Sequence, residues 1–251
     1  MKSVEIKAGF MQRILVVLVM LFSFCGFAQK FAQKADPPRP AAAAGGDLDT
    51  VLSQMDKAAQ GFKSVQADFE WDQYTKVVNE TDVQKGQLYL QRHGNDLEAG
   101  VIITSPASKQ IVFKDGKVRM YEPKIDQITE RAVGANKADV ESFMRLGFGE
   151  RGHDLLTSYE VKMDGWETVD GVKTAKLELE GKASSSIRNM FSRIIWWIDP
   201  EHDVSLRQQL FQPAGDYRLA HYSNIKVNAK PSQDFFHLHT TSKTRVVIMK
   251  P

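Results

Sequence analysis

Two short stretches of the chain carry side chains that could act as nucleophiles or as metal ligands. Ser184-Ser-Ser186 offers hydroxyl groups, and His237-Leu-His239 would place two imidazoles on one side of a strand, where they could bind a metal ion. The serines lack the flanking glycines of a nucleophile elbow, and no third ligand accompanies the histidines at a convincing spacing. We therefore expect the serines in a surface turn and the histidines facing solvent.

Two further stretches gather acidic residues or glycines. Asp199-Pro-Glu-His-Asp203 surrounds a histidine with acids, but Asp-Pro followed by polar residues is typical of a hairpin turn. Gly147-Phe-Gly149 and the following Gly152 lack the strand, glycine-rich loop and helix that a phosphate site requires. The sequence accordingly predicts no catalytic residue, no metal site and no cofactor. An exported hydrolase with an unrecognised site stays open as an alternative.

The charge balance argues against a general electrostatic attraction to nucleic acids. The 251 residues include 33 Lys and Arg and 31 Asp and Glu, a formal net charge of +2. Lys2, Lys7 and Arg13 against Glu5 account for this excess, so the chain after residue 28 is neutral. A neutral chain lacks the positive field with which proteins bind DNA, RNA or anionic membrane surfaces. We therefore expect no nucleic acid partner.

The first 28 residues have the pattern of a secretory signal peptide. Basic residues precede an apolar run over 14–24, and small residues follow at Gly26 and Ala28. The apolar run is shorter than the roughly 20 residues of a membrane-spanning helix. Cleavage is expected after Ala28 and would remove Cys25, the only cysteine, so that no disulfide or thiolate site remains. A membrane anchor that stays uncleaved is the less favoured alternative.

The rest of the chain divides into a linker and one domain. Residues 29–46 are rich in Pro and Ala, which predicts a linker, and 47–251 show neither a second break in composition nor a repeat. Two helices are expected over 47–62 and 136–146, because apolar residues recur there at helical spacing behind Asp or Asn. Apolar residues at a period of two predict roughly ten strands. These strands cover 65–71, 83–92, 97–104, 110–113, 118–121, 127–131, 159–169, 175–179, 194–198, 205–211 and 217–222.

Short turns join these strands, and the turns determine the expected fold. Lys114-Asp-Gly116, Val169-Asp-Gly171 and Pro213-Ala-Gly215 are sequences that suit hairpins. Strands joined in this way form an antiparallel meander, and a sheet of this size must curl. The expected fold class is mainly β with helices (α+β). Its architecture is an unclosed antiparallel β-barrel, or strongly curved sheet, whose concave side is covered by helices that form a lid.

An ordered series of short motifs runs through the expected domain. It consists of Gly86-Gln-Leu-Tyr-Leu-Gln-Arg92, Ser105-Pro106, Gln110-Ile-Val112, Lys114-Asp-Gly116, Tyr121-Glu-Pro-Lys-Ile-Asp-Gln127, Phe148-Gly149, Tyr159, Val169-Asp-Gly-Val172, Leu177-Glu-Leu179, Ile195-Trp-Trp-Ile-Asp-Pro200, the residues 208–211, Gly215-Asp-Tyr217, Tyr222-Ser-Asn-Ile-Lys226, Asn228 and Phe235. No single motif is a sharp signature, but the ordered set is fairly specific. Over about residues 47–250 it resembles the outer-membrane lipoprotein carrier (LolA-like) family.

The resemblance implies an unclosed antiparallel β-barrel with a helical lid, and a carrier in the periplasm. Such a carrier takes acylated lipoproteins from an inner-membrane release complex and delivers them to an acceptor at the outer membrane. It also implies a monomer that binds acyl chains. Family members often hold the lid with an Arg shortly after the Gly-x-Leu-x-Leu-x-Arg strand. This chain departs from the pattern, because no Arg follows Arg92 in the stretch 93–100.

A carrier of acyl chains needs a loosely filled apolar pocket lined by adaptable side chains. The residues expected to line it are Phe69, Trp71, Leu88, Leu90, Phe143, Met144, Ile194, Trp196 and Ile198. The same periodicity is equally typical of a dry core, so that interpretation stays open for each of them. An envelope sensor or regulator that detects lipids or mislocalised lipoproteins with the same fold is a further alternative.

Overall fold

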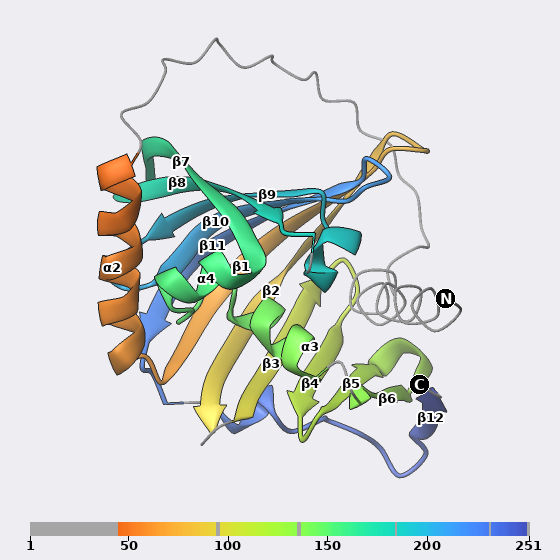
Figure 1. The fold of residues 1–251 in the computed structure, drawn as a ribbon. Coiled ribbons are helices and arrows are strands. Elements are labelled where there is room, and N and C mark those ends of the chain that lie inside the picture. Colours follow the sequence, from red (N-terminus) through yellow and green to blue (C-terminus); the bar gives the residue numbers. More distant parts are fainter. Residues whose placement is uncertain (1–44, 94–95, 135–136, 184, 231, 250–251) are drawn as a thin grey trace.

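The structure is a computed structural model that describes residues 45–93, 96–134, 137–183, 185–230 and 232–249 (Figure 1). The predicted signal peptide over 1–28, its cleavage after Ala28 and nearly all of the predicted linker over 29–46 lie outside these residues. In the described part of the chain, no helix is both long and apolar enough to cross a membrane.

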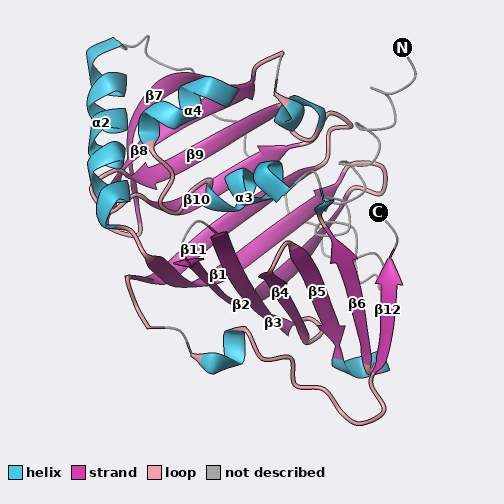
Figure 2. Cartoon of the chain, turned by 60° about the horizontal axis from the view of Figure 1, so that its bottom comes forward, coloured by secondary structure: helices cyan, strands magenta, loops and turns pink. Residues whose placement is uncertain are grey.

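The central element is one sheet of twelve strands in the order β12-β6-β5-β4-β3-β2-β1-β11-β10-β9-β8-β7 (Figures 1 and 2). Its strands are β1 (Ser64–Thr75), β2 (Glu80–His93), β3 (Asp96–Ser105), β4 (Lys109–Lys114), β5 (Lys117–Glu122), β6 (Gln127–Ala132), β7 (Tyr159–Val169), β8 (Val172–Gly181), β9 (Arg193–Asp199), β10 (Val204–Phe211), β11 (Tyr217–Val227) and β12 (Arg245–Met249). All strands predicted from the sequence are present.

Two antiparallel meanders, β1–β6 and β7–β11, are joined into this sheet by pairing of β1 with β11. The hairpin turns have the expected geometry: Asp115 and Gly116 have φ of 53° and 66°, and Asp170 and Gly171 have φ of 51° and 80°. Both residues of each turn are left-handed, which is the conformation of type I′ hairpins. The turn sequences therefore predicted these connections correctly.

The sheet is mixed rather than wholly antiparallel because β12 pairs in parallel with β6. Strand β12 was not predicted from the sequence. Its valines and isoleucine are largely exposed at the free edge of the sheet, and it reaches β6 through a long connection instead of a hairpin (Figure 2). Neither turn residues nor a buried alternating face mark such a strand.

The described part of the chain contains three α-helices; two lie in front of the middle of the sheet and one along the strand ends (Figure 1). They are α2 (Gly45–Gly61), α3 (Lys137–Arg145) and α4 (Gly152–Ser158). The helices predicted over 47–62 and 136–146 correspond to α2 and α3, whereas α4 was missed because its seven residues bury little more than Gly152 and Leu155. Short 3₁₀ helices lie at Pro123–Ile125, Ser186–Asn189 and Gln233–Phe235.

Helices α4 and α2 are in direct contact. A Cβ atom on Gly152 would lie 2.3 Å from the carbonyl oxygen of Leu52, so the two helices can approach this closely only with glycine there. His153 on α4 also binds two carboxylates of α2, with its Nδ1 2.5 Å from Asp56 Oδ2 and its Nε2 3.3 Å from Asp49 Oδ1. These contacts attach α4 to the edge of the fold.

Two apolar clusters make up the core. One joins α2 with β7–β10 and includes Met55, Leu177 and Trp196. The other extends from β1 across β2–β5 and includes Phe69, Leu88 and Phe113. Because α3 contributes Phe143 to the first cluster and Met144 to the second, it links the two halves of the sheet.

Candidate functional site: the concave face and the segment that covers it

Strand register places the predicted lining residues of the sheet on one face. Residues directly opposite each other in an antiparallel pair point to the same side. Trp71 of β1 is opposite Ala220 of β11, Ala220 is opposite Gln208, and Gln208 is opposite Trp196 of β9. By the same register Leu88 and Leu90 share the face of β1 that carries Phe69, and Ile194 and Ile198 flank Trp196.

The two remaining predicted residues lie on α3, which covers this face. Phe143 stacks on Phe191 with ring centroids 5.3 Å apart, and Met144 packs against the cluster of Phe69 and Leu88. All nine residues therefore meet on the concave side of the sheet. The lipid-binding role assigned to them stays a prediction.

The nine residues differ in burial. Trp196 and Ile198 are 0% exposed, and Phe69, Leu88, Leu90 and Ile194 are also buried. Trp71, Phe143 and Met144 are half-buried. The first six are thus parts of packed clusters in the form of the protein described here, whereas the last three lie closest to solvent. Binding of an acyl chain against all nine would require the helices to move.

Two prominent pockets of the described chain have volumes of about 260 and 420 Å³, and charged or polar residues provide most of their lining. Of the nine predicted residues, only Phe69 lines either pocket. The larger pocket involves β1, β2 and β11, with Asp68, Lys85 and His221 among its lining residues. Neither pocket is the apolar hollow that the sequence led us to expect.

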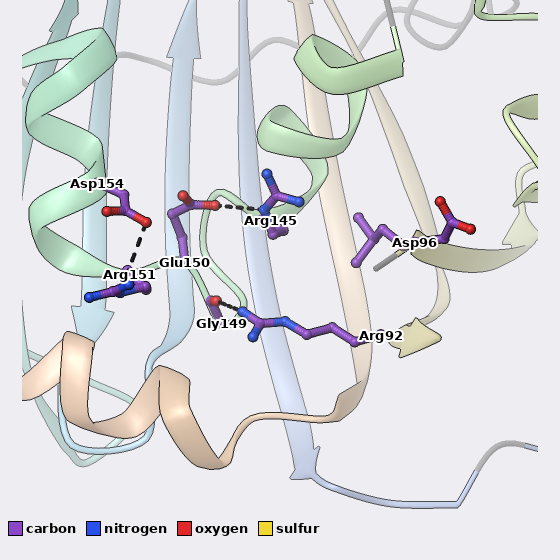
Figure 3. Close-up of a pocket in the computed structure, with 8 residues that line it drawn as sticks. Arg92, Asp96, Arg145, Gly149, Glu150, Arg151 and Asp154 are labelled. Atoms are coloured by element: carbon purple, nitrogen blue, oxygen red, sulfur yellow. Dashed lines mark hydrogen bonds and ion pairs between the residues drawn. The ribbon is translucent and has the colours of Figure 1, made fainter. Parts of the chain in front are cut away.

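The smaller pocket lies where the connection between α3 and α4 meets the ends of β2 and β3 (Figure 3). Arg145 Nε lies 3.0 Å from Glu150 Oε2, and Arg151 Nε lies 3.9 Å from Asp154 Oδ2. Together with Arg92 and Asp96, these side chains give the pocket three cations and three carboxylic acids. The positive and negative side chains therefore balance, and the two ion pairs attach the connection to α3 at one end and to α4 at the other.

Arg92 holds the connection between α3 and α4 to the sheet. Its guanidinium donates a hydrogen bond to the carbonyl oxygen of Gly149 (Figure 3). It also lies over the ring of Phe62, directly after α2, 5.8 Å from the ring centroid. Gly149 has φ of 77°, a left-handed conformation that favours glycine. The last residue of the Gly-x-Leu-x-Leu-x-Arg motif thus contacts the helical cover directly, in a chain that has no Arg over 93–100.

Strand β10 and the hairpin before it supply further contacts to the same connection. Ser205 N donates to the Gly147 carbonyl at 2.7 Å, Gln208 Nε2 to the Leu146 carbonyl at 2.8 Å, and Gly149 N to the Asp203 carbonyl at 3.1 Å. We call residues 137–158, which comprise α3, this connection and α4, the helical segment. The connection in its middle is held by a small number of polar contacts at and around Gly147 and Gly149.

Asp203 is a buried carboxyl beside these contacts. Its side chain is 0% exposed, and within the described residues neither of its oxygens has a hydrogen-bond partner. Burial raises the pKa of Asp203 to about 8; nearby Glu150 adds to the rise, while Arg92 opposes it. Burial likewise raises the pKa of Glu150, although Arg145 counteracts it. The sequence around Asp203 predicted a hairpin turn, which its φ of 53° fits, but it did not predict that the side chain is buried.

We expect Asp203→Asn to stabilise the protein near neutral pH. The pKa is higher in the folded state than the ordinary value of 3.8, so the folded state binds more protons and stability falls as pH rises from about 4 to about 8. Asn cannot ionise and tolerates a left-handed φ. The free energy of unfolding should rise by about 2 kcal/mol or more at pH 7.5 and change little at pH 4.

Urea denaturation of both proteins at the two pH values measures this difference. Asp115→Asn is the matched control, because Asp115 has the same φ of 53° in an exposed hairpin turn. The control should leave the pH dependence of stability unchanged. If the variant exceeded the wild type in stability by no more at pH 7.5 than at pH 4, the raised pKa of Asp203 would be contradicted.

The other residues considered for chemistry occupy ordinary structural positions. His237 and His239 are both exposed, with ring centroids 5.5 Å apart, and no group of three metal-binding side chains occurs among the described residues. Ser185 accepts a hydrogen bond from Ile187 N and so caps a 3₁₀ helix, whereas Ser184 lies outside the described residues. His202 Nδ1 lies 2.7 Å from Asp199 Oδ2 within the exposed hairpin.

Comparison with known proteins gives no match to a family model and none to a curated protein. Solved structures do match. An uncharacterized conserved protein from Thermus thermophilus has a TM-score of 0.52 at 11% identity, and the match covers 81% of this chain and 99% of that one. MucB has a TM-score of 0.50 at 12% identity over 77% of this chain. A LolA superfamily protein from Nitrosomonas europaea matches at 15% identity, over 76% of this chain and 97% of that one, with a TM-score of 0.35.

The match covers only 63% of the MucB chain, and at such identities these likenesses concern the fold alone. The architecture itself is the one that the resemblance to LolA-like proteins implied: an unclosed, curved sheet with helices over one face. The chain therefore shares its fold with MucB and the Thermus protein.

Proposed function

We propose that this protein is a periplasmic carrier that binds the acyl chains of lipoproteins or lipids against the concave face of its sheet and carries them from the inner to the outer membrane. The observation that supports the proposal most directly is the largely apolar concave face of the neighbouring strands β1, β11, β10 and β9, which the helical segment covers. No catalytic step is part of the proposal. By resemblance, the partners are an inner-membrane release complex and an outer-membrane acceptor, and the carrier acts as a monomer.

Burial of acyl chains provides ample free energy for such a role. Each methylene transferred from water contributes about 0.8 kcal/mol, so a lipid with several chains must travel inside a protein. A carrier must also release its ligand, which requires a cover that opens. The polar contacts of Arg92, Ser205 and Gln208 with the connection after α3 can break and form again without unfolding the sheet.

The test compares a triacylated peptide with the same peptide lacking its acyl groups. The purified protein should bind only the acylated form, and mass spectrometry of extracts from the freshly purified protein should detect lipids or acylated peptides. On binding, residues 137–158 should become better protected from hydrogen exchange, because acyl chains would add apolar contacts to a segment whose middle is otherwise held by a few polar contacts. Equal binding of both peptides would contradict the proposal.

A sensor and a carrier differ in what happens after binding. A carrier should pass the labelled acylated peptide to acceptor vesicles, whereas a sensor should retain it and bind a membrane partner. A hydrolase should cleave an ester or glycoside substrate. Transfer to vesicles without chemical change of the peptide is the result expected here.

A further inference from the structure

Arg218 is a cation on the concave face. It lies on β11 opposite Leu210 of β10 and Gln73 of β1, and Leu210 belongs to the same buried cluster as Ile194 and Trp196. Its guanidinium carbon is 5.1 Å from the centroid of the Trp71 ring. The side chain therefore projects toward the apolar interior instead of the outer surface.

The guanidinium has no oxygen partner within the residues that the structure describes: it forms neither a hydrogen bond nor an ion pair there. Other arginines of the described chain do have such partners. Arg92 binds the Gly149 carbonyl, Arg145 binds Glu150, and Arg193 lies 3.7 Å from Glu178. Arg218 is thus a cation without a counter-charge among the described residues, and its electrostatic neighbours there are the ring of Trp71 and the hydroxyl of Tyr222.

The surroundings of Arg218 show that this position is costly for the folded protein. Burial lowers the pKa of Arg218, although an arginine remains charged in a protein. The indole Nε1 of Trp71 is also buried; the hydroxyl of Tyr222 lies beside it, but the two do not form a hydrogen bond of normal geometry. A buried N–H group without a well-placed acceptor therefore lies beside a half-buried cation without a counter-charge, and a ligand could supply acceptor oxygens to both.

The part of the concave face around Arg218 is also accessible to solvent. Along β1, Phe69 is buried, whereas Trp71 and Gln73 are half-buried, so the concave face opens toward solvent at this end of the strand. Arg218 itself is half-buried. A ligand could therefore place its polar end at Arg218 and its aliphatic chain along the buried part of the face.

We propose that Arg218 binds the negatively charged head group of an amphiphile whose aliphatic chain lies along the concave face, with Trp71 stacked beside the guanidinium. The inference rests on the proposed function, since it needs acyl chains in the interior. It specifies the ligand class as a carboxylate or phosphate on an aliphatic chain. A guanidinium suits both groups because its N–H groups can donate two parallel hydrogen bonds to either.

The experiment measures affinities for dodecanoate, dodecyl phosphate and dodecanol, which share one chain and differ in head group. The wild-type protein should bind at least one of the anions about tenfold or more tightly than the alcohol, as a charge-assisted hydrogen bond to a desolvated cation predicts. Arg218→Gln should weaken anion binding to the level of the alcohol and leave alcohol binding unchanged. The stronger of the two anions identifies the head group as carboxylate or phosphate.

Two further variants control the interpretation. Arg193→Gln removes a cation that also stacks on an aromatic ring, Phe211 at 4.4 Å, but on the outer face, and it should keep the full preference for anions. Arg218→Lys keeps the charge and should keep part of that preference. Without ligand, Arg218→Gln should unfold at the same temperature as the wild type or higher, because it removes a cation that has no counter-charge.

Equal affinity of the wild-type protein for the alcohol and both anions would overturn the proposal, and this comparison does not depend on the folding of any variant. A preference for anions that persists in Arg218→Gln would overturn it as well. In either case, binding of the dodecyl chain would still support the proposed function. Failure of the wild type to bind any of the three ligands would instead contradict the proposed function itself.

Discussion

Phe143→Glu should abolish the binding of acyl chains while the sheet remains folded. Phe143 is half-buried on α3 and faces Phe191, so a carboxylate there would lie in the apolar interior under the helical segment. An unpaired charge in such surroundings costs several kcal/mol, which reduces affinity by several powers of ten. Glu favours helix formation, so α3 itself should persist.

Binding of a fluorescent fatty acid and of a triacylated peptide measures the effect, and circular dichroism shows whether each variant is folded. Phe143→Leu is the conservative control, because an apolar side chain of similar size should retain most of the binding. Replacing both exposed histidines, His237→Ala with His239→Ala, should not change uptake at all. Normal binding by a folded Phe143→Glu protein, with loss in the double histidine variant, would require a different site.

Trp196→Ala should lower the free energy of unfolding by about 3–5 kcal/mol, a large share of the 5–15 kcal/mol that stabilises a typical domain. Trp196 is 0% exposed in the cluster beneath α2, and its Nε1 donates to Ser205 Oγ at 2.9 Å. The substitution therefore leaves a cavity and removes the hydrogen bond that this buried hydroxyl accepts. Chemical denaturation followed by circular dichroism measures the loss without depending on tryptophan fluorescence.

Trp166→Ala is the matched control for this experiment. Trp166 is 38% exposed on β7 and contacts Lys173, so its loss should change stability by no more than about 0.5 kcal/mol. A destabilisation below about 1 kcal/mol for Trp196→Ala would instead mean that the tryptophan borders a space and not a packed core. The result thus distinguishes the two interpretations of the apolar lining that the sequence left open.

Local sequence was sufficient to predict most of the fold. The alternation of Val65, Ala67, Phe69 and Trp71 predicted both the strand and the face that it buries, because side chains of a strand alternate with a period of two. The turns at Asp115-Gly116 and Asp170-Gly171 predicted hairpins, because both residues must adopt a positive φ. Consecutive hairpins then fix an antiparallel meander, which leads to the curved, unclosed sheet.

Tertiary contacts determined the elements that sequence reasoning missed. Helix α4 is too short to show an apolar stripe, and it depends on the contact of Gly152 with Leu52 and of His153 with Asp56. Strand β12 pairs with a strand more than a hundred residues earlier in the chain, where β6 offers its free edge. Neither α4 nor β12 shows a recognisable pattern in its own sequence, because each depends on an element far away in the chain.

The sequence by itself determined which residues are apolar and to which face of a strand each belongs, so it predicted the nine residues that meet on the concave side. It did not determine their burial, because periodicity is the same for a packed core and for a cavity lining. Only the tertiary structure revealed that Asp203 is buried, that Arg92 reaches Gly149 and that Arg218 faces the apolar interior. The environment of a charged side chain depends on atoms from distant strands and helices, and their positions are set only when the chain has folded.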